Sequence, residues 1–440
     1  SCIAGVANTG TAPRVIDLPV VSGETYYLVI STNGTPLTIG YGLTIQKVNC
    51  PPPNNLSATV GPTFANLTWG NPAEATSWEY AVQNLNAPVP SGSGVQTNSN
   101  SNVNVTTTVN GVALNPTTTY QYYVRVDCGD GTFSAWAGPF LFTTTQIPGT
   151  LDFTENFEGA PEWSLINGSQ TNKWAIGTAT QNGGTKSLYI SNNNGTANAY
   201  TLTAASVVHA YRDIQMPDTL DEVLLTFDWK ARGQGFTTTF NDYFRVWIVP
   251  SNFTPAAGTQ ITQAASNGVQ VGGHFNNSTN FTSANYVLPM NTFAGQIVRL
   301  VFEWRNDASG GEQPPAAIDN INLSVITCPS PSNLVASNPL HDSATFTWDA
   351  PTSVTPTYDY YISDNNTPPT DTTDPTDNIS ATTITVSGLD QSTIYYFWVR
   401  SNCGSGNSFW TGPVSIATTQ IPATLVYTDG FEGVNVWFLY

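Results

Sequence analysis

The sequence predicts an all-β protein built of tandem β-sandwiches, and three observations support this. Short runs such as Ala65–Trp69 alternate apolar and polar residues, which is the pattern of half-buried strands. Only 10% of the 440 residues are charged, and Thr, Asn, Ser, Gly and Pro abound, a composition that favours strands and turns over helices. A hydrophobic content of 40%, with 12% aromatic residues, is ample for real cores.

The chain repeats itself at a long interval. The string TTQIP at Thr144–Pro148 recurs 274 residues later at Thr418–Pro422, and FEG at Phe157–Gly159 recurs after the same interval at Phe431–Gly433. A fixed period indicates an array of modules, and a period of this length must hold more than one domain. Because such arrays usually extend and bind, we expect a binding protein rather than a catalyst.

The charge balance excludes several classes of partner. Thirty acidic and twelve basic residues give a net charge of −18 at pH 7. Such a chain repels nucleic-acid phosphates and anionic lipids, so we expect no nucleic-acid partner. The sequence has no run of 18 apolar residues, so we expect no direct membrane insertion. Its first residues lack the basic-then-apolar order of a signal peptide, so we expect a mature or internal fragment.

The cysteines follow the same repeat. Cys50 and Cys328 each open a proline-rich stretch, and Cys128 and Cys403 each precede a glycine after a strand-like run. This spacing predicts the disulfides Cys50–Cys128 and Cys328–Cys403, each worth about 4 kcal/mol in the chain-entropy account; the alternative is four buried free thiols. Disulfides indicate an oxidising, extracellular environment. Cys2 is left over, and we expect its partner upstream of residue 1.

Residues 50–145 and 328–419 share one strand pattern and one turn motif. The run Leu114–Tyr120 reads LNPTTTY, and its counterpart Leu389–Tyr395 reads LDQSTIY. Both resemble the tyrosine corner of the fibronectin type III domain, in which the phenol bonds back to nearby backbone. The second copy lacks the proline, which weakens the turn. The resemblance also implies core positions on the second strand for Trp69 and Trp348.

Residues 146–327 form a larger unit between these two domains. Its opening at Glu155–Gly159 (ENFEG) and its closing at Pro314–Ile321 (PPAAIDNI) resemble the jelly-roll modules called choice-of-anchor J and, more distantly, MAM and cleaved-adhesin domains. Such modules accompany fibronectin type III domains in secreted proteins of the Bacteroidetes, which implies export by the type IX system. Residues 420–440 repeat only the start of this module, and residues 1–49 look like the C-terminal part of a preceding β-sandwich.

The jelly-roll resemblance implies a calcium site, because the first and last strands of such modules lie side by side. Calcium takes about six to eight oxygen ligands from carboxylates, amides, carbonyls and water. The leading ligands by resemblance are Glu158 and Asp319, with Asn156 and Asp242 as weaker ones, and the expected role of the ion is stabilising. The alternative is that Glu158 turns or caps the chain and that Asp319 accepts backbone hydrogen bonds.

Glycans could be attached to this chain covalently or bound by its aromatic side chains. The suspected bacterial lineage attaches O-linked glycans at a three-residue pattern. The pattern starts with Asp, continues with Ser or Thr, and ends with Thr or with a small or apolar residue. It predicts modification at Thr219, Ser343 and Thr372. Tryptophan rings could also form a sugar-binding face, although their apolar neighbours favour core packing. The tryptophans concerned are Trp163, Trp174, Trp229, Trp247 and Trp304.

The sequence shows no catalytic motif, so we expect no enzyme. His209, His274 and His341 lie outside any Gly-x-Ser-x-Gly or His-Glu-x-x-His pattern, although carboxylate pairs for glycoside hydrolysis stay open. Repetition, disulfides and low charge favour an adhesion stalk that binds glycans or surface proteins. By resemblance it is a gliding-motility adhesin or a type IX substrate that meets the outer-membrane secretion machinery. The alternatives are non-catalytic accessory modules of a secreted protease or glycosidase, and a structural spacer.

Overall fold

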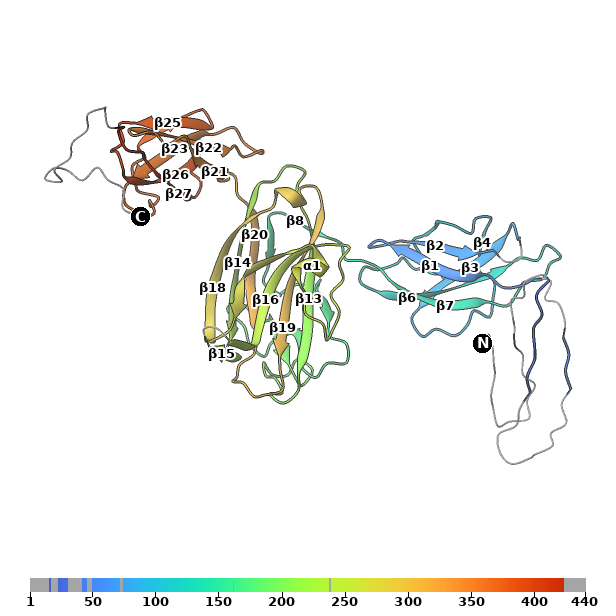
Figure 1. Ribbon diagram of the computed structural model, residues 1–440. Helices are drawn as coiled ribbons and strands as arrows, with labels where there is room; N and C mark the ends of the chain where they lie inside the picture. The colour runs from blue at the N-terminus through green and yellow to red at the C-terminus, as the bar shows by residue number, and fades with distance from the viewer. Residues whose placement is uncertain are drawn as a thin grey trace.

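The computed structural model describes residues 50–422 except 72–73, 161 and 237–238, together with residue 16 and the stretches 23–30 and 42–45. Within this part the chain is almost entirely β, with a four-residue α1 (Gln263–Ser266) and a three-residue 3-10 turn η1 (Asn291–Phe293). Three β-sandwiches follow one another along the chain (Figure 1). The prediction of an all-β chain of tandem sandwiches is confirmed.

The first sandwich pairs a three-stranded sheet, β1-β2-β5, with a four-stranded sheet, β4-β3-β6-β7. Its strands are β1 (Asn54–Val60), β2 (Ala65–Gly70), β3 (Trp78–Asn84), β4 (Val95–Thr97), β5 (Val103–Val105), β6 (Thr119–Val126) and β7 (Ala137–Thr143). The third sandwich repeats this arrangement with β21-β22-β25 and β24-β23-β26-β27. Its strands are β21 (Ser332–Ser337), β22 (Ser343–Asp349), β23 (Thr357–Ser363), β24 (Asp377–Ile379), β25 (Thr383–Ser387), β26 (Ile394–Asn402) and β27 (Thr411–Ala417).

Both tyrosine corners are present in these two sandwiches. The backbone N–H of Asn115 donates to the Tyr120 hydroxyl at 2.9 Å, and the N–H of Asp390 donates to the Tyr395 hydroxyl at 3.0 Å. The second corner forms without the proline because the bond needs only the backbone amide and the phenol. The tryptophans predicted for the second strand are buried in the cores, each with 2% exposure: Trp69 and Trp348.

The two predicted disulfides are confirmed. Cys50 bonds to Cys128 and Cys328 bonds to Cys403, with a Cα–Cα distance of 5.9 Å in each case. Each bond ties the segment before the first strand of a sandwich to the turn that follows β6 or β26. Cys2 lies outside the described residues.

The central sandwich packs a seven-stranded sheet on a six-stranded sheet. The seven-stranded sheet contains β8 (Gly149–Thr150), β10 (Ser164–Ile166), β13 (Ser206–Gln215), β15 (Gln234–Phe236), β16 (Thr239–Pro250), β17 (Val269–Phe275) and β19 (Ile297–Asn306). The six-stranded sheet contains β9 (Phe153–Glu155), β11 (Lys173–Gly177), β12 (Ser187–Ser191), β14 (Glu222–Ala231), β18 (Ser278–Pro289) and β20 (Ala317–Val325).

Strand alternation divides the residues of this sandwich between core and outer face. On β19, Leu300, Phe302 and Trp304 enter the core between the sheets. Successive side chains of a strand point to opposite faces, so Glu303 and Arg305 lie on the outer face of the seven-stranded sheet. A loop over residues 251–268 covers part of that face.

The chain enters and leaves the central sandwich at the same end. Gly149 pairs with Ile214 near the end of β13, and Val325 at the end of β20 pairs with Val223 near the start of β14. We call this the proximal end. The loops over residues 192–205 and 307–316 lie at the opposite, distal end. Both neighbouring sandwiches therefore attach near the proximal end, as Figure 1 shows, and the distal loops project away from them.

Buried hydrogen bonds anchor the first linker to the central sandwich. The side chain of Gln146, only 4% exposed, donates to the Ser164 hydroxyl at 2.8 Å and to the Tyr211 carbonyl at 3.0 Å. Its amide oxygen accepts the N–H of Asp213 at 2.7 Å. A linker held in this way cannot swivel freely.

Two adjacent carboxylates secure the second joint. Asp221 accepts hydrogen bonds from the backbone N–H and hydroxyl groups of Thr352 and Ser353, at 2.6 to 3.0 Å. Glu222 accepts the N–H of Ser330 at 2.9 Å. Burial alone would raise the pKa of Asp221, but the bonds from Ser353 and Thr352 outweigh it and hold the pKa below 3.8.

We predict that Asp221→Ala loosens this joint without unfolding either sandwich. Because the folded pKa of Asp221 is depressed, its contribution is complete above pH 3.8 and is lost as pH falls through the lower folded value. Small-angle X-ray scattering of the full chain should show a broader distribution of domain distances in the variant at neutral pH, and in the wild type in strong acid. Asp218→Ala, on the same loop, is the control. Unchanged scattering in Asp221→Ala would contradict the prediction.

Two predicted segments, residues 1–49 and 420–440, fall largely outside the described residues. In the described part of residues 1–49, the stretch 23–30 contains no assigned strand, and Tyr27 and Val29 are 88% and 83% exposed. Of residues 420–440 only the first three are described. No helix among the described residues is long and apolar enough to cross a bilayer.

Candidate binding and metal sites

The structure brings two of the predicted calcium ligands to one loop, residues 178–186 between β11 and β12. Glu158 accepts the N–H of Thr185 at 2.7 Å, the Thr185 hydroxyl at 2.6 Å and the N–H of Lys186 at 2.8 Å. Asp319, fully buried on β20, accepts the N–H of Asn182 at 2.7 Å. Both carboxylates therefore hold the loop, which is the alternative role considered for them.

The carboxylates at this loop differ in how readily they ionise: hydrogen bonds lower the pKa of Glu158 and of Asp228, whereas the pKa of Asp319 is raised. Burial raises the pKa of Asp319, and the negative charges of Asp228 and Glu158 raise it further. Asp228 lies opposite Asp319 on β14 and accepts hydrogen bonds from the side-chain amides of Asn182 and Asn320, each at 2.9 Å. Three acidic groups thus contact one loop, where hydrogen-bond donors and the nearby Lys186 offset part of their charge.

The two weaker candidates have other partners. The side-chain oxygen of Asn156 accepts the N–H of Glu158 at 3.2 Å, which makes a local turn. Asp242 lies on the other sheet and is fully buried. There it accepts the Tyr200 hydroxyl at 2.7 Å and the N–H of Asp307 at 3.0 Å. The structure therefore does not place Asp242 with Glu158 and Asp319.

The hydrogen-bond acceptors at the 178–186 loop are all oxygen atoms, and oxygen atoms are the ligands that calcium takes. Nowhere in the described part of the chain, however, do three or more His, Cys, Asp or Glu side chains form a metal-binding group. A cation at Glu158 and Asp319 would have to replace the N–H and O–H donors that now occupy them. Calcium binding at these two residues stays a prediction.

The tryptophans of the central sandwich pack in or against its apolar clusters, as their apolar neighbours predict. Trp174 and Trp304 are 1% and 0% exposed. Trp163 and Trp247 are also buried, and Trp229 is partly buried against the main core. The four buried rings therefore offer no open face for stacking on a sugar.

The predicted glycosylation residues differ in access. Thr219 and Thr372 are exposed. The Ser343 side chain is buried, with 7% residue exposure, and its hydroxyl donates to Asp342 at 3.2 Å. Attachment of a glycan to Ser343 would therefore have to precede folding, whereas the two threonines are accessible in the folded chain.

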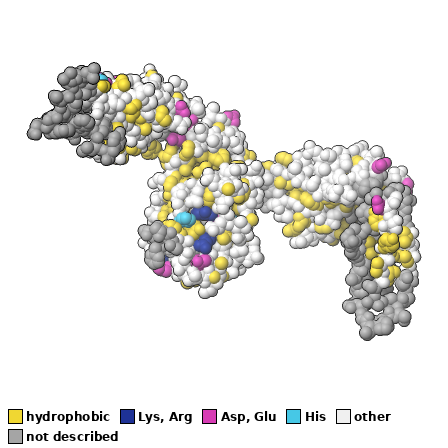
Figure 2. Space-filling view, viewed as in Figure 1, with side chains coloured by type: hydrophobic (Ala, Val, Ile, Leu, Met, Phe, Trp, Pro, Cys, Tyr) yellow, Lys and Arg dark blue, Asp and Glu magenta, His cyan; other side chains and the backbone are white. Residues whose placement is uncertain are grey.

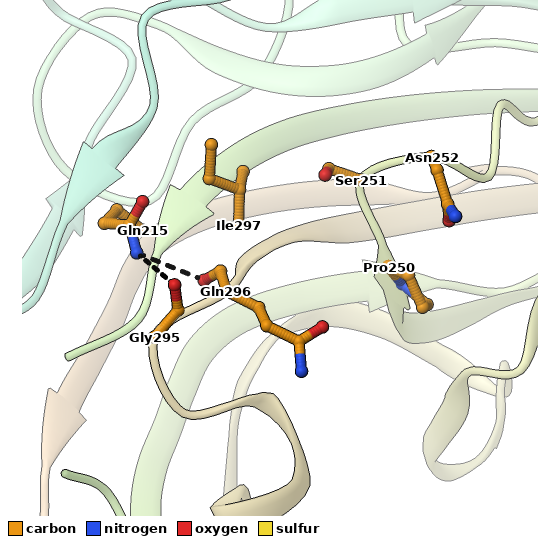
Figure 3. Close-up of a pocket in the computed structure, with 7 residues that line it drawn as sticks. All are labelled: Gln215, Pro250, Ser251, Asn252, Gly295, Gln296 and Ile297. Atoms are coloured by element: carbon orange, nitrogen blue, oxygen red, sulfur yellow. Dashed lines mark hydrogen bonds between the residues drawn. The ribbon is translucent and has the colours of Figure 1, made fainter. Parts of the chain in front are cut away.

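A shallow groove of about 410 Å³ lies at the proximal end of the central sandwich. It is lined by Gln215, the segments 250–252 and 295–296, and Ile297. Figure 3 shows the Gln215 side-chain amide donating to the carbonyls of Gly295 and Gln296, at 3.1 and 3.5 Å. Its lining of amides, one hydroxyl and apolar groups holds no titratable side chain. The groove suits a neutral polar group and provides no acid or base.

A second groove, of about 290 Å³, runs along β9 and β20 beside the 178–186 loop. Its lining includes the amides of Asn156, Asn320 and Asn322. These side chains add hydrogen-bonding capacity next to the carboxylates of Glu158 and Asp319. Sequence motifs could not have located this groove, because its two walls are about 165 residues apart in the chain.

Sequence reasoning also missed a buried charge cluster around Glu303. This fully buried carboxylate accepts Arg245 Nε at 2.9 Å, Ile261 N–H at 2.6 Å and His209 Nε2 at 3.2 Å. Burial opposes ionisation, but His209, Arg245 and Ile261 together lower the pKa of Glu303. The bond from Ile261 holds the 251–268 loop on the sheet. Because neither Glu303 nor His209 has any exposed side-chain surface, the cluster is closed to substrates.

Comparison with known proteins identifies one of the three sandwiches. Residues 329–417 match the family model of the fibronectin type III domain. A search of curated proteins finds no significant match to the chain.

Among solved structures, one similar chain is that of the chicken CNTN1 FN1-FN3 domains, with 12% identity, a TM-score of 0.19, and coverage of 84% of this chain and 100% of that one. Another belongs to a study of carbohydrate-binding modules of the β-sandwich superfamily, with 12% identity, a TM-score of 0.25, and coverage of 63% and 99%. A third is the glycoside hydrolase domain of Endo-D from Streptococcus pneumoniae R6, with 13% identity, a TM-score of 0.23, and coverage of 58% and 37%. At these TM-scores the likenesses carry no argument about ligand or activity.

Proposed function

We propose that this chain is part of an extracellular adhesion stalk in which fibronectin type III domains carry and present a larger binding sandwich. The observation that carries the proposal is the placement of both linkers at the proximal end of the central sandwich. Its distal loops and much of its outer surface therefore stay free while the chain continues. The fibronectin type III domain and the two disulfides fit an extracellular protein.

The finer assignment rests on sequence resemblance. The ENFEG and PPAAIDNI segments support a choice-of-anchor J module, and the alternation of modules supports a surface protein exported by the type IX system, such as a gliding-motility adhesin. Glycans or surface proteins are the proposed ligands, and the outer-membrane secretion machinery is a proposed transient partner.

Beads coated with the full chain should bind a subset of immobilised glycans or extracellular proteins in a broad screen. Beads that carry the reduced and heat-denatured chain are the control, because adhesion by folded sandwiches should be lost when all three are unfolded. If the native chain bound no glycan and no protein beyond this control, the adhesion proposal would fail and a structural spacer would remain.

We also propose that calcium stabilises the central sandwich at Glu158 and Asp319 by neutralising the carboxylates around the 178–186 loop. Calcium should raise the melting temperature of the full chain, chelator should reverse the rise, and Glu158→Gln or Asp319→Asn should abolish it. Asp218→Asn, which removes an exposed charge elsewhere, should keep it. Metal analysis that finds no bound calcium, with no shift in melting, would refute the proposal.

A further inference from the structure

Basic residues are scarce in this chain, and their distribution is uneven. Of the ten Lys and Arg residues that the structure describes, eight lie in the central sandwich. The two in the fibronectin-like sandwiches, Arg125 and Arg400, are paired with Glu79 and Asp359. Figure 2 shows blue basic side chains and a cyan imidazole gathered on the central sandwich beside hydrophobic surface.

One group of these residues forms a patch with aromatic rings on the outer face of the seven-stranded sheet. Tyr243 on β16 lies opposite Arg305 on β19. His274 on β17 lies 4.3 Å from the Tyr243 ring and stacks on Phe240 at 4.6 Å, measured between ring centroids. Arg245 is the next outward residue of β16. We call Phe240, Tyr243, Arg245, His274 and Arg305 the basic aromatic patch.

The patch is accessible from solvent. His274 is exposed, and Phe240, Arg245 and Arg305 are partly exposed. Tyr243 is 6% exposed and forms the floor, where its hydroxyl accepts the side-chain amide of Gln260 at 3.0 Å. The 251–268 loop covers the neighbouring part of the sheet, and through Gln260 it borders the patch without covering it.

Arg305 supplies a guanidinium with donors to spare. Its Nη1 donates to the carbonyls of Phe240 and Asn241, which hold the group in place. Within the described residues, its Nε and Nη2 have no acceptor and it has no ion pair. Arg245, by contrast, is neutralised by Glu303 beneath the surface.

The local potential is positive at His274. The neighbouring rings partly desolvate its imidazole and lower its pKa, and the charges of Arg245 and Arg305 lower it further, against the opposing effect of Glu303. Asp307, two residues after Arg305, carries a negative charge that Ser309 fixes by two hydrogen bonds. This neighbour disfavours a densely charged polyanion and leaves room for a ligand with isolated carboxylates.

We propose that the basic aromatic patch binds a saccharide that carries a carboxylate, such as a uronic acid unit of a polysaccharide. Arg305 would pair with the carboxylate, since guanidinium groups hold carboxylates by two parallel hydrogen bonds. The rings of His274 and Phe240 would contact the apolar side of the sugar, and Gln260 lies at the rim to bind hydroxyls. This inference rests on the proposed adhesive function and names its ligand class.

The test measures binding of the full chain to trigalacturonic acid and to its methyl ester, which has the same rings without the charges. We expect the acid to bind at least about tenfold more tightly, because only the acid can form charge-assisted hydrogen bonds with Arg305. Arg305→Gln should remove this preference. The matched control is Arg232→Gln, which removes a partly exposed guanidinium of the same sandwich that pairs with Glu312 and should leave binding within about twofold.

A second variant, His274→Ala, keeps the test decisive if Arg305→Gln folds poorly, because this exposed ring can be removed with little strain; weaker binding of both probes is expected. Equal binding of acid and ester, binding of neither, or full binding by Arg305→Gln and His274→Ala would overturn the inference. In those cases a ligand found in the broad adhesion screen would leave the proposed function standing. The absence of any ligand there would refute both.

Discussion

Replacing Glu303 with Gln should lower the free energy of unfolding of the central sandwich by about 3 to 5 kcal/mol. Glutamine keeps the shape of the side chain but leaves the Arg245 guanidinium, whose side chain is 12% exposed, without its counter-charge. An uncompensated charge in such a position is strongly destabilising. The hydrogen bond from the Ile261 N–H to this side chain would also be weakened or lost, so the 251–268 loop should loosen.

Thermal unfolding of the full chain, with the transition of the central sandwich resolved from the others, measures this effect. Glu312→Gln is the control, because its pair with Arg232 is exposed and such pairs contribute about 0 to 1 kcal/mol. Since the pKa of Glu303 is depressed in the folded state, its stabilisation is present above pH 4.5 and is lost as pH falls through the lower folded value. Similar effects of Glu303→Gln and Glu312→Gln would show that the cluster does not hold the loop.

Removing the disulfide of either fibronectin-like sandwich should destabilise that sandwich by about 4 kcal/mol. The bonds span 78 and 75 residues, and the chain-entropy account depends on this separation, so the two losses should be nearly equal. Cys50→Ser with Cys128→Ser tests the first bond, and Cys328→Ser with Cys403→Ser tests the second. Paired replacement avoids leaving a lone reactive thiol.

Unfolding by denaturant, followed separately for each sandwich, gives the two losses. Cys2→Ser is the matched control, because it removes a cysteine without touching either bond. Unequal losses would show that strain or residual structure of the unfolded chain, rather than loop length, decides the contribution. No loss in either variant would contradict the structural role of the disulfides.

Local and repeated features could be predicted from the sequence alone. The disulfides followed from cysteines that recur with the repeat, and the tyrosine corners followed from a seven-residue motif. Burial of Trp304 followed from its place in an apolar run. In each case the residues that cooperate are close in the chain or occur twice, so the pattern itself carries the constraint.

Surface sites were harder to predict, because they depend on strand order and register. The prediction that Glu158 and Asp319 approach each other relied on resemblance, and the structure shows both accepting hydrogen bonds from the 178–186 loop. Asp242, grouped with them from the sequence, lies on the other sheet with Tyr200. No sequence motif indicated that Arg305 would face Tyr243, because that contact depends on the pairing of β16 with β19.

The sequence by itself determined the class of this protein: strand-forming composition and period-two patterning require sheets, and repeated cysteines require disulfide-bonded modules. Only the tertiary structure decided that both linkers join the proximal end of the central sandwich and that Asp221 fastens the second joint. It alone decided that Glu303 is buried under a loop while Arg305 stays open to solvent. The physical reason is that side-chain alternation says which residues share a face, whereas the order of strands and the path of loops decide which of those faces are covered.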